Sequence, residues 1–70
     1  MADSVYKMIQ IVGTSSTSWA EAGANAVRTA SATLRDIRVA EVEKLDLHIE
    51  EGGALTYRAK LNVSFKFEGS

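Results

Sequence analysis

The side chains with the clearest capacity for chemistry are four glutamates in the second half of the chain, Glu41, Glu43, Glu50 and Glu51. Their carboxylates are hard oxygen ligands of the kind that calcium takes, about six to eight at roughly 2.3–2.6 Å. No loop has the Asp-x-Asp-x-Asp-Gly spacing of a self-contained calcium site. Any calcium site must therefore be assembled from several strands or several copies of the chain, and the default expectation is that these carboxylates are solvated surface charges. Neutral oxygen donors available to such a site are Gln10, Asn62 and Ser64.

The single histidine, His48, is a second candidate metal ligand. Asp46 and Glu50 flank it at alternate positions, and imidazole with carboxylates suits many divalent ions. On a strand, however, residues two apart are separated by about 6.6–7 Å, which is too far for a tight cage within one chain. We expect His48 to be a surface histidine near a turn.

Catalytic chemistry has little support in the sequence. The chain has one His, no Cys and no Gly-x-Ser-x-Gly motif. The hydroxyls at positions 14–17 have no recognisable base beside them and are better explained by turn and cap hydrogen bonds. The sequence therefore predicts a protein that is not an enzyme.

Size and composition favour assembly. The 70 residues form one domain, residues 1–70, and a domain of this size buries only about 60% of its unfolded surface. Without Cys, disulfides cannot supply the missing stability, which leaves oligomerisation. The net charge of -1 with scattered Lys and Arg argues against nucleic acid. No signal peptide and no apolar stretch of ~20 residues is present, so we expect a cytoplasmic protein with no membrane partner.

The elements that must position these side chains follow from the apolar patterns. Residues 5–12 are β-branched and aromatic-rich, which predicts a strand that Gly13 stops. Ser18 and Glu21 fit a capping box, and a helix of about four turns follows. Its inward face is thin, and Gly23 on that face suggests close backbone packing. The inward residues are Gly23, Ala26, Val27, Ala30 and Leu34, and the outward ones are Glu21, Asn25, Arg28 and Thr29.

Two alternating segments, residues 45–50 and 55–68, predict a long hairpin around Glu51-Gly52-Gly53. A three-residue loop makes Ile49/Leu55, Leu47/Tyr57 and Leu45/Ala59 apolar pairs and places Asp46 opposite Arg58, whereas a two-residue loop would set Leu45 against Lys60. The alternation changes phase before Leu45, which predicts a β-bulge near Glu43 and Lys44. The order is strand, helix, strand, strand.

The last predicted strand is too long for one helix to cover. Its 14 residues span about 45 Å at ~3.3 Å per residue. We expect its far end, with Val63, Phe65 and Phe67, to be left as an exposed apolar edge, which proteins normally cover or pair. The simplest partner is another copy of the chain.

Several short segments, read in order, point to a known family: Val5-Tyr6-Lys7, Ile11-Val12-Gly13-Thr14-Ser15, Leu34-Arg35, Glu41-Val42, the Glu-Gly turn and Val63-Ser64-Phe65-Lys66. In this combination the chain resembles the dodecins over nearly its whole length. The resemblance implies an α+β subunit of β-α-β-β order, with a three-stranded antiparallel sheet packed on one helix. It further implies that twelve copies assemble into a hollow dodecamer of cubic symmetry.

Two positions depart from the flavin-binding members of that family. Those members stack the isoalloxazine ring on a Trp near the start of the second strand and hydrogen-bond it through a Gln on the third. The matching positions are Val39 and Arg58; valine has no π face, and Arg only donates hydrogen bonds. The pattern looks more like the branch called calcium dodecins, which lack that Trp. Trp19 opens the helix, and we expect it to pack there rather than stack on a ligand.

The sequence and the resemblance together predict a non-enzymatic homo-oligomeric shell that binds, stores or sequesters small ligands or calcium. Val39 and Arg58 are its candidate ligand-binding residues; the other interpretation of Arg58 is a cross-strand ion pair with Asp46. Calcium is favoured over flavin as the bound group, and the metal ligands are left open. Two alternatives stand: a flavin-binding (FMN or riboflavin) storage dodecin with altered contacts, and a structural assembly with no specific ligand.

Overall fold

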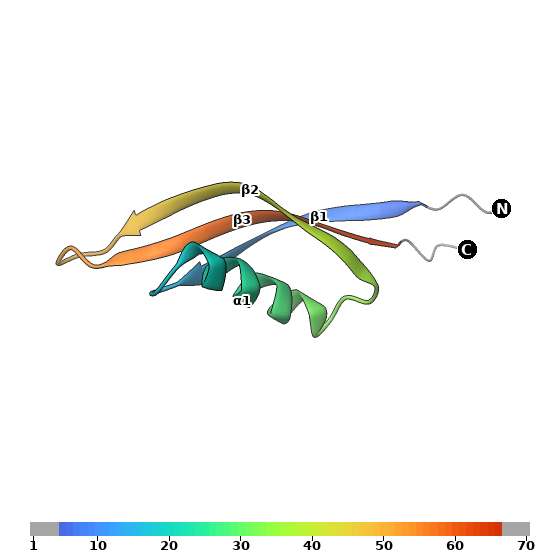
Figure 1. Ribbon diagram of the computed structural model, residues 1–70, viewed down its shortest axis with the longest axis horizontal. Coiled ribbons are helices and arrows are strands. Elements are labelled where there is room, and N and C mark those ends of the chain that lie inside the picture. Colours follow the sequence, from blue (N-terminus) through green and yellow to red (C-terminus); the bar gives the residue numbers. More distant parts are fainter. Residues whose placement is uncertain (1–4, 67–70) are drawn as a thin grey trace.

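The computed structural model describes residues 5–66 and contains four elements: β1 (Tyr6–Ser15), α1 (Trp19–Ser31), β2 (Ile37–Ile49) and β3 (Leu55–Lys66). The three strands form one antiparallel sheet in the order β1-β3-β2. The helix lies across one face of this sheet, and the other face carries no helix (Figure 1). The predicted order and the helix-on-sheet arrangement are confirmed.

Strand β1 does not stop at Gly13, as the sequence predicted, but runs on to Ser15. Gly13 lies directly against α1. A Cβ there would collide with the carbonyl oxygen of Ala22 and lie 2.7 Å from the Ala26 Cβ. The prediction of close packing at Gly23 was wrong, because a Cβ on Gly23 would meet only the Leu61 Cδ2 atom, at an ordinary 3.9 Å.

The start of α1 is fixed by hydroxyl groups. Ser18 is the N-cap and its Oγ accepts a hydrogen bond from the Glu21 N–H at 3.0 Å. The Glu21 carboxylate pairs with Arg28 (Oε2 to Nη1, 3.4 Å), so only the serine half of the predicted capping box forms. In the preceding turn the buried Ser15 Oγ accepts from the Thr17 N–H at 3.0 Å. These contacts confirm turn and cap roles for the loop hydroxyls.

The hairpin between β2 and β3 has the predicted register. Ile49 pairs with Leu55, Leu47 with Tyr57 and Leu45 with Ala59. The turn closes through a hydrogen bond from the Glu50 N–H to the Ala54 carbonyl at 2.7 Å. Gly52 and Gly53 have φ of 89° and 95°, a region that side chains disfavour, so these two glycines make the turn possible.

The register of β2 shifts twice against β3. One shift lies between Val42 and Lys44, and it confirms the bulge predicted near Glu43. The other lies between Ile37 and Val39, with Arg38 as the extra residue, and was not predicted. Each bulge bends the strand and re-aims its side chains, so β2 curves over β3 (Figure 1).

The core is small. Its buried members are Ala22, Ala26, Ala59, Leu61 and Val63, and Val63 is the largest side chain that is fully buried. The predicted exposure of Val63 was therefore wrong, because α1 covers the middle of β3. Phe65 is half-buried, and Phe67 lies outside the described residues. On the helix side of the sheet, exposed apolar side chains lie at the opposite end of β3, on the β2–β3 hairpin.

The molecule is too elongated to be a complete globule. Its principal extents are 56 × 20 × 15 Å and its radius of gyration is 14.5 Å, whereas a compact chain of this length has a radius of about 11 Å. Large apolar side chains remain exposed on both faces of the sheet, among them Met8, Val12, Leu45 and Ile49.

Among residues 5–66, no helix is long and apolar enough to cross a membrane. The cytoplasmic location expected from the sequence stays a prediction.

Candidate functional site

One face of the sheet is not covered by α1 and is here called the open sheet face. It carries most of the side chains that could bind a metal ion or another ligand. The buried residues Ala59, Leu61 and Val63 point toward α1, so the alternate positions of β3 and their cross-strand partners point away from it. The open sheet face comprises Met8, Gln10, Val12 and Thr14 of β1, Val39, Glu41, Lys44, Asp46 and His48 of β2, and Thr56, Arg58, Lys60, Asn62 and Ser64 of β3.

A row of side chains with oxygen atoms that could coordinate a metal ion crosses this face. Asn62 on the central strand pairs with Gln10 on one side and with Glu41 on the other. The bulge brings Glu43 to the same row, where its Oε1 accepts a hydrogen bond from the Gln10 Nε2 at 2.8 Å. Sequence reasoning named each of these residues as an oxygen donor but did not predict that they share one row. The bulge was the available signal, because it re-aims Glu43.

The predicted glutamates do not form a single cluster. Glu50 and Glu51 lie at the far end of the hairpin, seven or more residues along the strand from Glu43, which is at least about 20 Å. Ser64 lies one row away from Asn62, and its Oγ donates to the Val39 carbonyl at 3.4 Å. Within residues 5–66 no three His, Asp or Glu side chains are placed to share one metal ion.

His48 lies exposed near the turn, as predicted, with its Nε2 3.6 Å from Glu50 Oε1.

Basic residues adjoin the row of oxygen donors. Lys44 pairs directly with Lys60, an arrangement of like charges that is unfavourable unless other groups offset it. Glu43, next to Lys44 in the bulge, supplies a nearby negative charge. The open sheet face is therefore mixed in charge, and the Lys44–Lys60 pair follows from the same register that pairs Leu45 with Ala59.

Arg58 makes the predicted ion pair with Asp46. Its Nε donates to Asp46 Oδ1 at 2.7 Å and its Nη2 to Oδ2 at 2.9 Å, so the pair is bidentate. The hydrogen bond from Arg58, supported by its positive charge, lowers the pKa of the Asp46 carboxyl below its usual value, and the carboxylate in turn raises the pKa of Arg58. Two of the guanidinium nitrogens are thus engaged within the chain.

Val39 lies on the open sheet face opposite Ser64, directly after the Arg38 bulge, and 58% of its surface is exposed. Arg58 is six residues from Ser64 along β3, a distance of about 20 Å. One chain therefore does not bring the two candidate ligand-binding residues together. Whether either residue contacts a ligand stays a prediction.

Trp19 has the packing role expected of it. Its ring meets Tyr57 edge to face, with centroids 5.2 Å apart and planes at 87°. Its Nε1 donates to the Asp46 carbonyl at 3.0 Å. The helix start is thereby tied to the middle of the β2–β3 hairpin.

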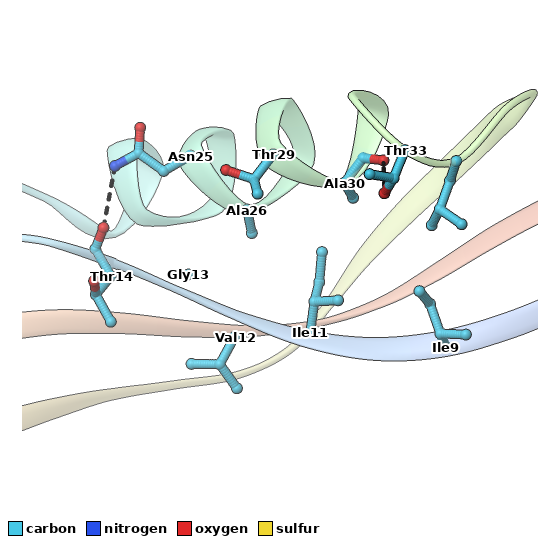
Figure 2. A pocket seen from close by; sticks show the side chains of 11 residues that line it. Ile9, Ile11, Val12, Gly13, Thr14, Asn25, Ala26, Thr29, Ala30 and Thr33 are labelled. Carbon is cyan, nitrogen blue, oxygen red and sulfur yellow. Dashed lines mark hydrogen bonds between the residues drawn. The ribbon is translucent and has the colours of Figure 1, made fainter.

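A groove of about 770 Å³ lies between α1 and β1. Figure 2 shows Ile9 and Ile11 of β1 facing Ala26 and Ala30 of the helix across it, with Thr29 and Thr33 along the rim. At one end the Asn25 Nδ2 donates to the Thr14 carbonyl at 3.1 Å and links the two walls. Sequence reasoning missed this groove, since it depends on the tilt of α1 across the sheet and not on a motif.

The comparisons with known proteins decide the family. The model of the family described as Dodecin matches residues 5–68. The chain belongs to the Dodecin family. It is 54% identical over 63 residues to the calcium dodecin of Mycobacterium tuberculosis, a match that covers 90% of this chain and 89% of that protein.

Solved dodecin structures share the fold. The crystal structure of the M. tuberculosis calcium dodecin, described as calcium chelating with a novel calcium-binding site, superposes with a TM-score of 0.87 at 52% identity and covers 96% of each chain. The dodecin of Streptomyces coelicolor superposes with a TM-score of 0.89 at 34% identity over the whole of both chains. These likenesses confirm the resemblance to calcium dodecins that the sequence indicated.

Proposed function

We propose that this dodecin is a non-enzymatic homo-oligomeric shell, a dodecamer, that sequesters calcium or another small ligand. One observation carries the proposal: the chain leaves its interior unfinished. A slight helix covers only the middle of a sheet in a molecule 56 Å long, so further copies must bury the rest. The assembly then creates enclosed surfaces that one subunit does not have.

Calcium is the bound group that the residues favour. The row of Gln10, Asn62, Glu41 and Glu43 offers carboxylate and amide oxygens on the open sheet face, and such hard oxygens suit calcium. No three acidic or histidine side chains of residues 5–66 converge in one chain, so ligands from a second copy or water would have to complete a site. The similarity to a calcium dodecin supports the same choice.

Flavin is the less favoured group. Val39 and Arg58 stand at the positions where flavin-binding dodecins carry Trp and Gln. An aromatic stacking pair contributes about 0.5–1.5 kcal/mol beyond area burial, and valine cannot replace it. The Arg58 guanidinium is also held by Asp46.

Calorimetric titration of the assembled protein with calcium tests the proposal, with the same titration in excess chelator as the blank. We expect saturable binding that Glu43→Gln weakens at least tenfold, since this change removes a charged oxygen ligand. Glu21→Gln is the matched control, because Glu21 lies on the helix side of the sheet, and it should bind as the wild type does.

Two outcomes would favour the alternatives. Purified protein that is yellow, with flavin in a fixed ratio to the chain, would support a flavin-storage dodecin with altered contacts. An intact colourless particle that shows no calcium binding would support a structural assembly without a specific ligand.

A further inference from the structure

The outer half of the β2–β3 hairpin, here called the arm (residues 45–57), has an apolar face with no cover. Leu45, Leu47 and Ile49 are 48%, 41% and 72% exposed, and Leu55 is 43% exposed. Their pairing with Ala59, Tyr57 and each other puts them on the helix side of the sheet. The helix begins at Trp19, which covers Tyr57, and then runs away from the arm (Figure 1).

The groove between α1 and β1 is the matching concave surface on the same side of the sheet. The apolar part of its lining comes from Ile9 and Ile11 on β1 and from Ala26, Ala30 and Leu34 on the helix side. The helix side also contributes Asn25, Thr29 and Thr33, but Ala26 and Ala30 are small, so an incoming side chain the size of Leu or Ile can lie close to the backbone there. β1 is also an edge strand without a bulge, and such an edge is normally covered.

Charged residues indicate which way the arm would lie along the groove. The turn at the tip of the arm carries Glu50 and Glu51, and the Leu34 end of the groove continues into Arg35. Within residues 5–66 neither Glu51 nor Arg35 has an ion-pair partner. An arm lying in the groove with its tip toward Leu34 would bring these opposite charges together.

The arm cannot reach the groove of its own chain. Trp19 binds the Asp46 carbonyl, so Ile49 lies about 10 Å beyond that point along the strand. The helix runs from Trp19 away from the arm (Figure 1), and Ala30 lies about 16 Å along it. Within one chain, Ile49 and Ala30 are therefore separated by much more than the ~7 Å between Cα atoms that a disulfide tolerates.

We propose that the arm of each subunit docks in the α1–β1 groove of the next subunit, with Ile49 against Ala30 and the acidic tip beside Arg35. The inference rests on the proposed homo-oligomer and deepens it, because it names the surfaces that meet. Arm and groove are different surfaces, so the contact is heterologous, and such contacts close into rings when the rotation between subunits permits.

Cross-linking tests this contact directly, because the chain has no Cys of its own. The variant Ala30→Cys/Ile49→Cys is assembled, its native mass is measured, and it is oxidised and separated on a denaturing gel without reductant. We expect intermolecular disulfides that link more than two chains. The matched control is Ala30→Cys/His48→Cys, since His48 neighbours Ile49 but lies on the open sheet face, and it should remain mostly uncross-linked.

The outcomes separate this inference from the proposed function. An intact particle with no cross-link, or with equal cross-linking of the control, overturns the docking and leaves the shell standing. Covalent dimers alone would indicate a two-fold contact and would also overturn it. If the wild-type chain is monomeric in the native-mass measurement, the proposed function itself is contradicted.

A second set of variants decides the case if the cysteine variants do not assemble. Glu51→Arg and Arg35→Glu should each lower the melting temperature of the particle at low salt, and the double variant should recover most of the loss. Losses that simply add would show that the two charges do not meet, and would contradict the docking.

Discussion

Two glycines at the interface between helix and sheet differ in how tightly their surroundings are packed. Gly13 on β1 lies against the helix backbone, where a Cβ would collide with the Ala22 carbonyl and come within 2.7 Å of the Ala26 Cβ. Gly23 on the helix has room, because an added Cβ would lie 3.9 Å from the nearest Leu61 atom. The neighbours of Gly13 are backbone and a core alanine, so they cannot move aside cheaply.

We therefore predict that Gly13→Ala destabilises the protein by about 1–3 kcal/mol or more, as overpacking of a core does. Gly23→Ala should instead stabilise it by up to about 1 kcal/mol, because alanine is the better helix former. Thermal melts at equal subunit concentration measure both, since assembly makes the melting temperature depend on concentration. Equal effects of the two changes would contradict the packing described for α1 and β1.

The Asp46–Arg58 ion pair makes the stability of the folded protein depend on pH. Hydrogen bonding to Arg58 lowers the pKa of Asp46 in the folded state, while the unfolded chain titrates near an ordinary value of about 3.9. The contribution to stability is therefore present above about pH 4 and is lost as the pH falls through the lowered folded value. Because both side chains are partly exposed to solvent, at 44% for Arg58 and 38% for Asp46, the contribution is small.

Asp46→Asn should accordingly lower the melting temperature near pH 7, and its difference from the wild type should shrink as the pH falls below about 4. Melting curves between pH 2 and 7 measure this. Asp36→Asn is the control, because Asp36 has no ion pair among residues 5–66 and its positive φ of 58° suits Asn equally well. A difference between Asp46→Asn and the wild type that persists unchanged into acid would show that the ion pair is not its cause.

At the scale of elements, the N-cap of α1 consists of a single side-chain hydroxyl. The Ser18 Oγ accepts from the Glu21 N–H, and the Glu21 carboxylate is turned toward Arg28, so no reciprocal bond supports the cap. We predict that Ser18→Ala costs about 1 kcal/mol. Ser16→Ala, a change at an exposed serine two residues earlier, should have almost no effect. Equal melting temperatures for the two variants would contradict the capping role.

The strand pairing was predictable because it follows from the chemistry of opposed side chains. Shifting the strand register by one residue would have set Leu45 against Lys60. The alternation of apolar and polar residues changes phase between Val42 and Leu45, and this change predicted the bulge at Glu43. The bulge at Arg38 was hidden, because Ile37 and Val39 already look like alternate apolar positions. The end of β1 was misjudged because Gly13 has the residue type of a strand stop, while its actual role is a tertiary contact with α1.

The candidate site was predictable only in part. Residue types identified the oxygen donors, and register placed Asp46 opposite Arg58. The meeting of Gln10 and Glu43 across β3 depends on a bulge and three strands together, and the α1–β1 groove depends on the helix tilt. The bulge was visible in the sequence, but the arrangement of the three strands and the tilt of the helix are tertiary geometry that no local pattern contains.

At the scale of the whole molecule, the subunit is incomplete. Residues 5–66 include five buried apolar residues, and the radius of gyration is 14.5 Å, against about 11 Å for a compact domain, so too much apolar surface is left in water. Leu and Ile side chains on the arm and Met8, Val12 and Val39 on the open sheet face all remain exposed. Assembly is the physical means by which such a subunit becomes stable.

The native mass of the purified protein tests this claim most directly. Mass spectrometry under native conditions, or light scattering after size exclusion at micromolar subunit concentration, should show a single closed particle of about twelve copies of the 7.6 kDa chain. A folded single chain that stays stable and compact on dilution would contradict the claim.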